Sequence, residues 1–205
     1  MDVRKKKQKK VNTDCGDKPE EGDAWVHTSV KRGSYFFAAF SVGKWTQNTC
    51  NELIENLSNV TIKPSEQSRL RVFTDGNDCY NYALPKYYPL EFIDYGQLVK
   101  IKRKGRLVEK IKRVIYGNPS LDEIETTDIE NHNGIFRERC GRLVRKTKCF
   151  SKKKERLICA VQLFKFHWNF GKEIKRGESP GMMEGLADHV FTWHEFFYFR
   201  LTISN

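Results

Sequence analysis

Several features that mark other protein classes are missing from this sequence of 205 residues. No apolar run approaches the ~20 residues that a membrane-spanning helix needs, so no membrane span is predicted. The N-terminus is too basic and too polar for a secretory signal peptide. The six cysteines form no CxxC pair and no Cys/His spacing typical of zinc sites, which predicts reduced, mostly buried thiols. We therefore expect a cytoplasmic protein with no membrane partner.

Acidic residues are outnumbered by basic ones. The 37 Lys and Arg exceed the 26 Asp and Glu, which gives a formal charge of +11 and a pI near 9.4. Such an excess favours a polyanionic partner, with nucleic acid the first candidate and an acidic membrane surface the second. Hydrophobic residues make up 39% of the chain and aromatic residues 13%, which is enough to build a core.

The N-terminal residues differ in composition from the remainder of the chain. The run RKKKQKK from Arg4 to Lys10 holds six cations in seven residues, and the stretch that follows is polar and acidic without periodicity. We expect a flexible basic arm over 1–22 and one folded domain over 23–205. Such an arm can be a solvated tail, a phosphate-binding arm or a nuclear address.

Two strand-like runs open the predicted domain. Residues 24–30 and 35–42 are joined by a short turn that contains Gly33, which predicts a β-hairpin. The second run is almost continuously apolar, so we expect both of its faces to be covered. Thr46 is a candidate N-cap for a helix that packs back on the hairpin, and lone His27 is interpreted as a strand side chain.

A third strand is predicted over 69–74, directly before Asp75 and Gly76. In α/β sheets, functional groups lie at the carboxyl ends of strands, so Asp75 is a candidate site residue. The Asp-Gly pair is also common in ordinary turns, and both interpretations remain open. A short helix at 80–83 and a strand at 90–93 are expected next.

Residues 98–103 and 106–116 predict a basic β-hairpin that turns at Lys104 and Gly105. Eight Lys or Arg lie among residues 100–113 and alternate with apolar side chains, so one face is expected to point outward. Runs of charge are often merely solvated, but this face is also a candidate track for nucleic-acid phosphates. The candidate contacts are Lys100, Lys102, Arg103, Lys104 and Arg106.

The segment 127–150, TDIENHNGIFRERCGRLVRKTKCF, is predicted to be a helix that carries chemistry. At 100° per residue, Glu130, Gly134, Arg137 and Gly141 share one line. The two glycines leave room for a bulky group such as a nucleic-acid backbone. Alternatively, Glu130 only closes a capping box at the helix N-terminus. The remaining surface of this helix presents further candidate DNA contacts, Arg139, Arg142, Arg145 and Lys146.

A second long helix is predicted over 152–170, with His167 beside its apolar stripe and expected to pack there. The region 179–199 begins with a Pro-Gly turn and has an aromatic end. We assign it to packing or to subunit contacts.

Glu130, Asn133 and Arg137, followed by GRLVRKTKCFSK at 141–152, resemble the acidic-helix signature of insertion-sequence transposases of the DDE type, in the family of insertion element one. The likeness runs from about Ala24 to the C-terminus. It implies an α/β, RNase H-like fold, with a mixed five-stranded sheet flanked by helices and, here, a basic β-hairpin insertion. The implied activity is DNA transposition: DNA strand cleavage and strand transfer at the ends of the insertion sequence. Three carboxylates would hold two Mg²⁺ or Mn²⁺ ions for these reactions.

The resemblance also implies roles for individual residues. Asp75 would be the second and Glu130 the third of the metal-binding carboxylates, and Arg137 would grip a phosphate with its planar fork. The first carboxylate of the family ends the first strand, before a pattern resembling Arg-x-Ser. Here Lys31 stands at that position, and Asp23 sits at the wrong end of the strand. We therefore expect Lys31 to pair with Asp75 and Glu130, and metal-dependent activity to be weak or absent.

Family members usually carry a zinc-ribbon and helix-turn-helix region before the catalytic domain, and this chain starts at the basic arm instead. The alternative function is a non-catalytic DNA-binding remnant on the same fold. It would inhibit an active transposase by occupying DNA or by mixed oligomerisation with the full-length protein. The expected partners are thus DNA and a homo-oligomer or mixed oligomer, in the cytoplasm at the nucleoid. An RNA-binding or RNase H-type nuclease is a third hypothesis.

Overall fold

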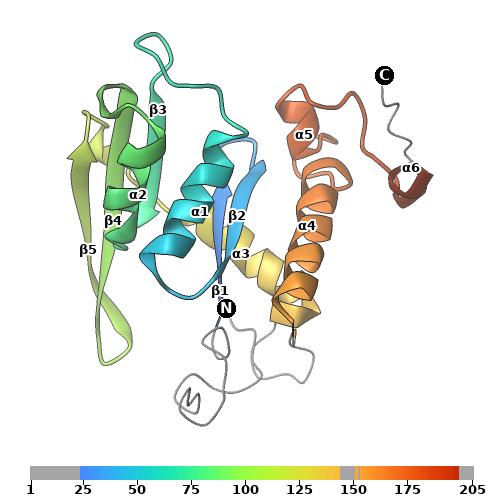
Figure 1. Ribbon diagram of the computed structural model, residues 1–205, viewed down its shortest axis with the longest axis horizontal. Coiled ribbons are helices and arrows are strands. Elements are labelled where there is room, and N and C mark those ends of the chain that lie inside the picture. Colours follow the sequence, from blue (N-terminus) through green and yellow to red (C-terminus); the bar gives the residue numbers. More distant parts are fainter. Residues whose placement is uncertain (1–23, 144–150, 152, 199–205) are drawn as a thin grey trace.

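The computed structural model describes residues 24–143, 151 and 153–198 (Figure 1). The expected basic arm over 1–22 lies outside this range. The strands are β1 (Trp25–Val30), β2 (Phe37–Gly43), β3 (Leu70–Asp75), β4 (Ile93–Arg103) and β5 (Arg106–Tyr116). The helices are α1 (Gln47–Ser58), α2 (Cys79–Tyr87), α3 (Thr127–Arg139), α4 (Lys154–Phe170), α5 (Pro180–Met183) and α6 (Trp193–Tyr198). Short 3₁₀ turns occur at Leu90–Phe92, Leu121–Glu123 and Gly141–Leu143.

The five strands form two separate sheets. β1 and β2 pair antiparallel, whereas β3 pairs parallel to β4 and β4 pairs antiparallel to β5. The mixed α/β architecture with flanking helices is confirmed. The expected single five-stranded sheet is not what the described residues form, because no backbone pairing joins β1 to β3.

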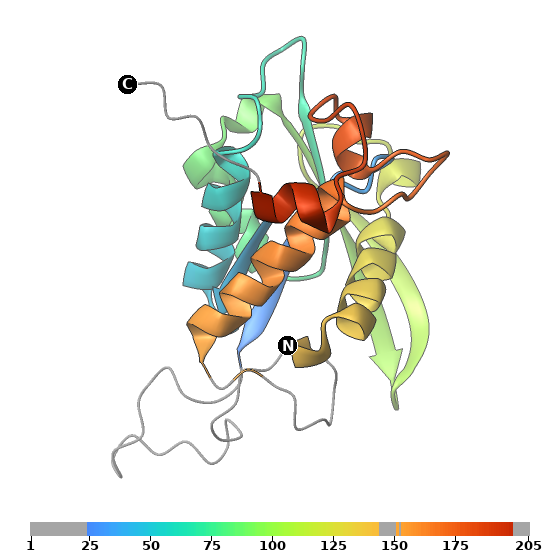
Figure 2. The same ribbon diagram turned by 90° about the vertical axis from the view of Figure 1, so that its right-hand side faces the viewer.

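The β1–β2 hairpin closes through Lys31, whose backbone N–H donates to the carbonyl of Phe36 at 2.9 Å. Gly33 and Tyr35 have φ values of 87° and 59° in this connection, so the chain can reverse tightly there. α1 and α4 both pack against β2, and α4 crosses the hairpin in Figure 2. The expectation that β2 is covered on both faces is therefore confirmed.

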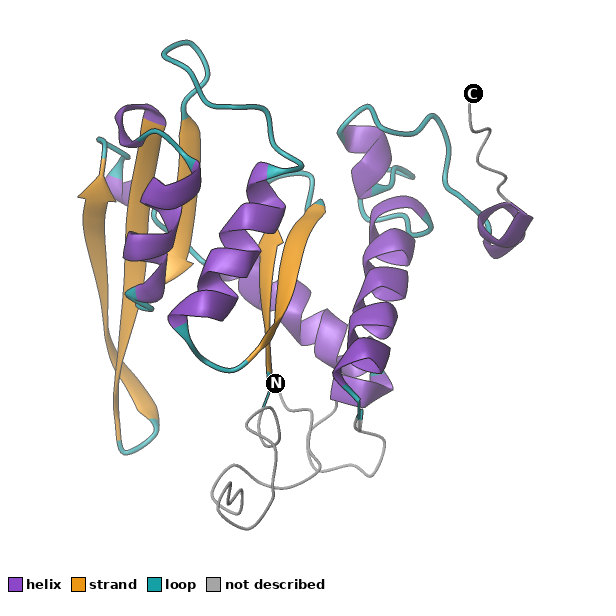
Figure 3. Cartoon of the chain, in the orientation of Figure 1, coloured by secondary structure: helices purple, strands orange, loops and turns teal. Residues whose placement is uncertain are grey.

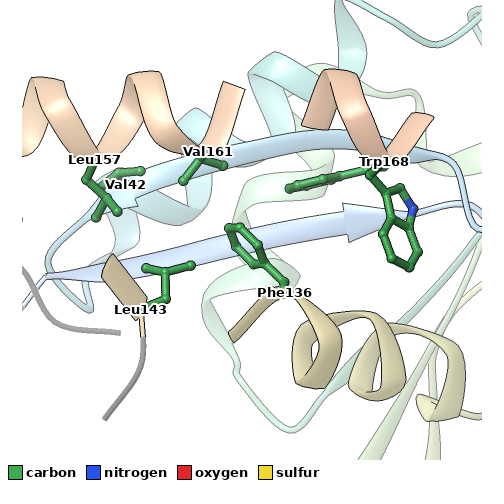
Figure 4. Packing of buried hydrophobic residues seen from close by; sticks show 7 residues of the cluster. Val42, Phe136, Leu143, Leu157, Val161 and Trp168 are labelled. Atoms are coloured by element: carbon green, nitrogen blue, oxygen red, sulfur yellow. The ribbon is translucent and has the colours of Figure 1, made fainter. Parts of the chain in front are cut away.

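The main core lies between this hairpin and the helices α3 and α4 (Figure 4). Its buried members are Phe37, Val42, Phe136, Leu143, Leu157, Val161 and Trp168. A second cluster joins α1 and α2 to the three-stranded sheet through Ile54, Leu84, Ile93 and Tyr95. Each sheet thus has its own apolar packing, and α1 contacts both parts of the molecule.

The basic hairpin is confirmed, and it is longer than predicted. Leu90–Phe92 form a 3₁₀ turn that leads into β4, so the two strands predicted at 90–93 and 98–103 are replaced by one strand from Ile93. At the tip, Lys104 and Gly105 both have positive φ, at 50° and 79°, as a two-residue type I′ turn requires.

Two helices differ from their predicted bounds. α2 continues to Tyr87 although Pro85 lies inside it, and the hydroxyl of Tyr116 donates to the carbonyl of Asn81, the acceptor that Pro85 cannot use. α3 ends at Arg139 rather than near residue 150, because Cys140 is extended and a 3₁₀ turn follows. Gly141 is therefore not on the α3 face, and residues 144–150 lie outside the described range.

We predict that Asn169 is the most sensitive polar core position. Its side chain accepts from the Phe37 N–H at 2.8 Å and donates to the Phe37 carbonyl at 3.0 Å, all buried. Asn169→Ala would leave both backbone groups unsatisfied, so the free energy of unfolding should fall by roughly 2–4 kcal/mol. Urea denaturation would measure this loss. The exposed Gln162→Ala on the same helix should change stability by no more than about 0.5 kcal/mol, and an equal effect of both variants would contradict the assignment.

Candidate functional site

A cleft of about 1840 Å³ separates the two sheets. β1 and β3 line it along their lengths, with α1 and α2 on one side and α3 on the other. Asp75, Glu130 and Arg137 all lie in its wall. The three predicted catalytic residues, which come from different parts of the sequence, therefore line the same cleft.

Asp75 ends β3 and opens onto the cleft. Surrounding protein atoms desolvate the carboxylate and raise the pKa of Asp75 above its usual value, and the negative charge of Glu130 raises it further. The backbone N–H of Asn77 donates to Asp75 Oδ1 at 3.3 Å, and this hydrogen bond acts to lower the pKa of Asp75. Two carboxylates close enough to influence each other in this way are typical of a site that binds a cation.

Glu130 lies in the first turns of α3. Its Oε1 accepts hydrogen bonds from the ammonium of Lys100 and from the hydroxyl of Thr126. Burial acts to raise the pKa of Glu130, but these two bonds and the charge of Lys100 outweigh burial and lower it. The N-cap of α3 is Thr126 rather than Thr127, and its side chain makes no cap bond to the backbone. The capping-box interpretation of Glu130 is therefore wrong.

The expected pairing of Lys31 with the two carboxylates is also wrong. The Lys31 ammonium lies 2.6 Å from Glu184 Oε2. β1 and β3 run in opposite directions (Figure 3), so a residue that follows β1 lies far along the cleft from Asp75 at the end of β3. The cation that does meet the carboxylates is Lys100, from β4.

Sequence reasoning missed this role of Lys100 and assigned it to the phosphate track. The Lys100 side chain is 27% exposed, and its ammonium forms an ion pair with Glu130. The contact depends on strand pairing, because β4 pairs parallel to β3 with Asp75 opposite Leu98. Lys100 lies two residues further along and shares a face with Leu98, but the register of two strands cannot be read from a single sequence.

α3 is fixed to β1 on the side of the cleft. The Thr28 hydroxyl donates to Asn133 Oδ1 at 2.9 Å. Arg137, one turn further on, is exposed, and a Cβ at Gly134 would meet nothing within 4 Å. The open space predicted beside Gly134 is therefore present, and the Arg137 guanidinium is accessible to a ligand.

The remaining candidate DNA contacts fall into three groups. Lys102, Arg103, Lys104 and Arg106 are exposed at the tip of the basic hairpin, and no ion pair engages them within the described residues. Arg139 is exposed at the end of α3, whereas Arg142 donates to Ser151 Oγ at 3.1 Å. Arg145 and Lys146 lie outside the described residues.

Three histidines, His27, His132 and His167, pack against aromatic rings, whereas the exposed His189 contacts the carboxylates of Asp188 and Glu195. His27 is 6% exposed beside Tyr80, and burial lowers its pKa to about 4. His132 is enclosed by aromatic rings and its pKa is also lowered to about 4 by burial. His167 stacks on Trp193 with ring centroids 5.0 Å apart. The packing predicted for His27 and His167 is confirmed. In the C-terminal region Phe196 packs on Phe166 with ring centroids 4.3 Å apart, whereas Phe197 and Tyr198 are exposed, so its assignment to packing or to subunit contacts stays a prediction.

The cysteine prediction holds only in part. The four described cysteines, Cys50, Cys79, Cys140 and Cys159, are free. Only Cys50 is buried, so the expectation of mostly buried thiols is wrong for these four.

The carboxylates of Asp75 and Glu130 are the kind of donor that Mg²⁺ and Mn²⁺ bind. Carboxylate oxygens suit these ions, which are often held by one or two carboxylates together with water and substrate phosphates. Asp75 and Glu130 fit one such ion. Within the described ranges no group of three or more His, Cys, Asp or Glu could hold a metal, so a third carboxylate is lacking there.

Comparisons with known proteins identified no relative of this chain. No family model, no curated protein and no solved structure matches this chain. Among the helices described, none is long and apolar enough to cross a membrane.

We predict that Lys100→Gln raises the pKa of Glu130. The substitution removes the hydrogen bond and the positive charge that favour the carboxylate form. The pKa of Asp75 should rise as well, because Lys100 also lowers it. NMR titration of the carboxyl carbons would measure both pKa values.

Lys102→Gln, on the same strand, is the control and should leave both pKa values in place. In the unmodified protein the pKa of Glu130 is lower in the folded state than in the unfolded state. The ionised carboxylate therefore stabilises the fold at pH values above the unfolded-state pKa. This contribution is lost as the pH falls through the folded-state pKa. An unchanged pKa of Glu130 in Lys100→Gln would contradict the role of Lys100.

Proposed function

We propose that this protein is a DNA transposase domain of the DDE type, whose Asp75–Glu130 site serves cleavage and transfer of DNA strands. One observation carries the proposal: Asp75 from β3, Glu130 from α3 and the exposed Arg137 line the same cleft, although they are far apart in the sequence. Lys100, which pairs with Glu130, belongs to strand β4 of the basic hairpin. A nucleic-acid surface on this hairpin would therefore adjoin the site.

Each residue has a defined task in this proposal. Asp75 and Glu130 would hold Mg²⁺ or Mn²⁺, which when bound activates the attacking hydroxyl and stabilises the leaving oxygen. Arg137 would clamp a phosphate from the open side of Gly134 by paired hydrogen bonds. The exposed cations at the hairpin tip would hold the DNA backbone without reading its sequence.

The activity is expected to be impaired if the described residues alone form the site. Lys100 occupies an oxygen of Glu130 that a metal ion would need, and its charge repels a cation. Only two carboxylates meet there, whereas a two-metal clamp needs more ligands. These features, rather than Lys31, are the physical grounds for weak activity.

The second candidate is a non-catalytic DNA-binding protein that inhibits an active transposase. The ion pair between Lys100 and Glu130 favours it, because a built-in cation already balances one carboxylate. Metal-dependent activity separates the two candidates. A preference for RNA–DNA hybrid over duplex DNA would support the nuclease hypothesis instead.

We predict weak Mn²⁺-dependent cleavage and joining of DNA that carries the ends of the insertion sequence. Asp75→Asn and Glu130→Gln should each lower the rate by at least roughly 10–100-fold, the loss that even outer residues of metal sites cause. Glu138→Gln, an exposed carboxylate of α3 outside the cleft, is the matched control. Lys31→Asp should give no gain, because Lys31 pairs with Glu184.

These outcomes divide the hypotheses. If the protein binds DNA but Mn²⁺ promotes no cleavage in any variant, the DNA-binding candidate replaces the transposase. If only Lys31→Asp is active, the placement of the site at Lys100 is wrong.

We further predict that the hairpin tip supplies part of the salt-dependent DNA affinity. The triple variant Lys102→Gln, Lys104→Asn and Arg106→Gln should lower the slope of log K against log salt by about 2–3, since each lost phosphate contact removes roughly 0.9. The charge-matched control changes Lys153, Lys154 and Arg156, at the exposed start of α4, to Gln. Fluorescence anisotropy over a salt series would measure both slopes. Equal slopes would show that the tip is only solvated.

A further inference from the structure

Two of the described cysteines, distant in the sequence, lie together in the fold. Cys50 is in the first turn of α1 and Cys79 is the first residue of α2, and these two helices pack against each other (Figure 1). Both side chains belong to the apolar cluster that joins the two helices to the three-stranded sheet. Both thiols are free. They therefore form a pair of neighbouring thiols that the candidate chemistry does not use.

Polar bonds hold the two cysteines in this arrangement. The Asn77 side chain donates from Nδ2 to Cys50 Sγ at 3.6 Å, and its Oδ1 accepts from the Cys79 N–H at 3.2 Å. Gln47, also in the first turn of α1, donates to the Cys79 carbonyl at 2.9 Å. One amide side chain therefore contacts both cysteines, and a second fixes the start of α2 to α1.

The two thiols differ in their access to solvent. Cys50 is 1% exposed, whereas Cys79 is half-buried. Burial is the main cause that raises the pKa of Cys50 to about 12, and the charge of Cys79 and a hydrogen bond between the two side chains add to this shift. A thiol buried in this way is inert toward dissolved oxidants. Cys79 is therefore the thiol of this pair that an oxidant reaches first.

We propose that Cys50 and Cys79 form a reversible disulfide when the protein meets hydrogen peroxide. The Cys79 sulfur attacks one peroxide oxygen and the O–O bond breaks. The hydroxide that leaves takes the Cys79 proton as water, and Cys79 becomes a sulfenic acid. The Cys50 sulfur then attacks the Cys79 sulfur, the S–O bond breaks, and this second hydroxide leaves with the Cys50 proton. Two thiols are thus oxidised, one peroxide is reduced to two waters, and a thiol reductant reverses the reaction.

Asn77 connects this pair to the candidate site. Its backbone N–H donates to Asp75 Oδ1 at 3.3 Å, while its side chain bonds to both cysteines. A disulfide replaces the thiol that accepts from Asn77 and pulls the start of α2 toward α1. Both changes act on Asn77, so oxidation moves the N–H that orients Asp75. Oxidation therefore weakens metal binding at Asp75; this consequence rests on the proposed function, whereas the disulfide does not.

Mass spectrometry of the full-length protein tests the disulfide. Trypsin releases Cys50 in residues 45–69 and Cys79 in residues 72–86, and each of these peptides holds one cysteine. After mild treatment with hydrogen peroxide and alkylation of free thiols, the two peptides should appear joined, and dithiothreitol should separate them. Cys159→Ser removes an exposed cysteine of α4 and is the control, which should bridge as before. Cys79→Ser should leave Cys50 as a thiol.

Two results would overturn the disulfide. One is Cys79 left unmodified, or oxidised to its sulfinic or sulfonic acid, without any joined peptide. The other is a joined peptide that links two molecules only, which a mixture of ¹⁵N-labelled and unlabelled protein detects.

NMR and calorimetry test the connection to the site. The backbone amide of Asn77 should change its chemical shift on oxidation, while the amides of α4 should keep theirs. Mn²⁺ affinity, measured without DNA after the peroxide is removed, should be at least roughly tenfold lower in the bridged protein, since loss of a group that orients a metal ligand typically costs that much. Cys79→Ser should bind Mn²⁺ equally well before and after the peroxide treatment.

These measurements fail independently of one another. A disulfide with an unchanged Asn77 amide and an unchanged Mn²⁺ affinity would overturn the connection to the site and leave the disulfide standing. If the reduced protein binds no Mn²⁺, the metal role of Asp75 in the proposed function is wrong. The joined peptides and the Asn77 amide would then still decide whether the disulfide forms and acts on Asn77.

Discussion

Backbone pairing stops at β1 and at β3, and the rest of the molecule is arranged around that interruption. Among the described residues no hydrogen bonds join the edges of β1 and β3, so contacts through helices connect the two sheets. α1 does this from one side, since it packs on the β1–β2 hairpin and on α2. The cleft exists because helices, rather than strands, connect the two sheets.

α3 completes the connection from the other side, and it does so with polar bonds as well as core packing. Phe136 joins it to the core below the β1–β2 hairpin, and Asn133 bonds to Thr28. Glu130 bonds to Lys100 on the other sheet. α3, which carries Glu130, therefore also sets the width of the cleft. A change in the charge of Glu130 would affect both the chemistry of the candidate site and this width.

Local patterns predicted the elements well. The basic hairpin, α1, β3 and α4 follow from turn residues and apolar periodicity, which are properties of neighbouring residues. The extension of α2 through Pro85 could not be predicted. It depends on the Tyr116 hydroxyl, which donates to the Asn81 carbonyl in place of the N–H that proline lacks. The end of α3 at Arg139 was also missed, since the basic residues that follow have good helix propensity.

The site was predicted less completely than the fold. Asp75, Glu130 and Arg137 meet in one cleft as expected, but the cation beside them is Lys100 and not Lys31. The error has a physical origin. The sequence places Lys31 after β1 and Asp75 at the end of β3, but it does not say whether these two strand ends lie side by side. Strand direction and register decide that, and both depend on pairing between distant segments.

If the site binds a metal as proposed, Lys100 and the metal ion would compete for Glu130. With the ammonium on Glu130, the negative charge of that carboxylate is partly neutralised by the protein itself. A divalent ion must displace that ammonium, and the free energy of breaking the ion pair is subtracted from metal affinity. A released Lys100 would be free to pair with a phosphate of bound nucleic acid instead. Metal and nucleic acid would therefore bind more favourably together than either does alone, which couples the chemistry of the site to the presence of its substrate.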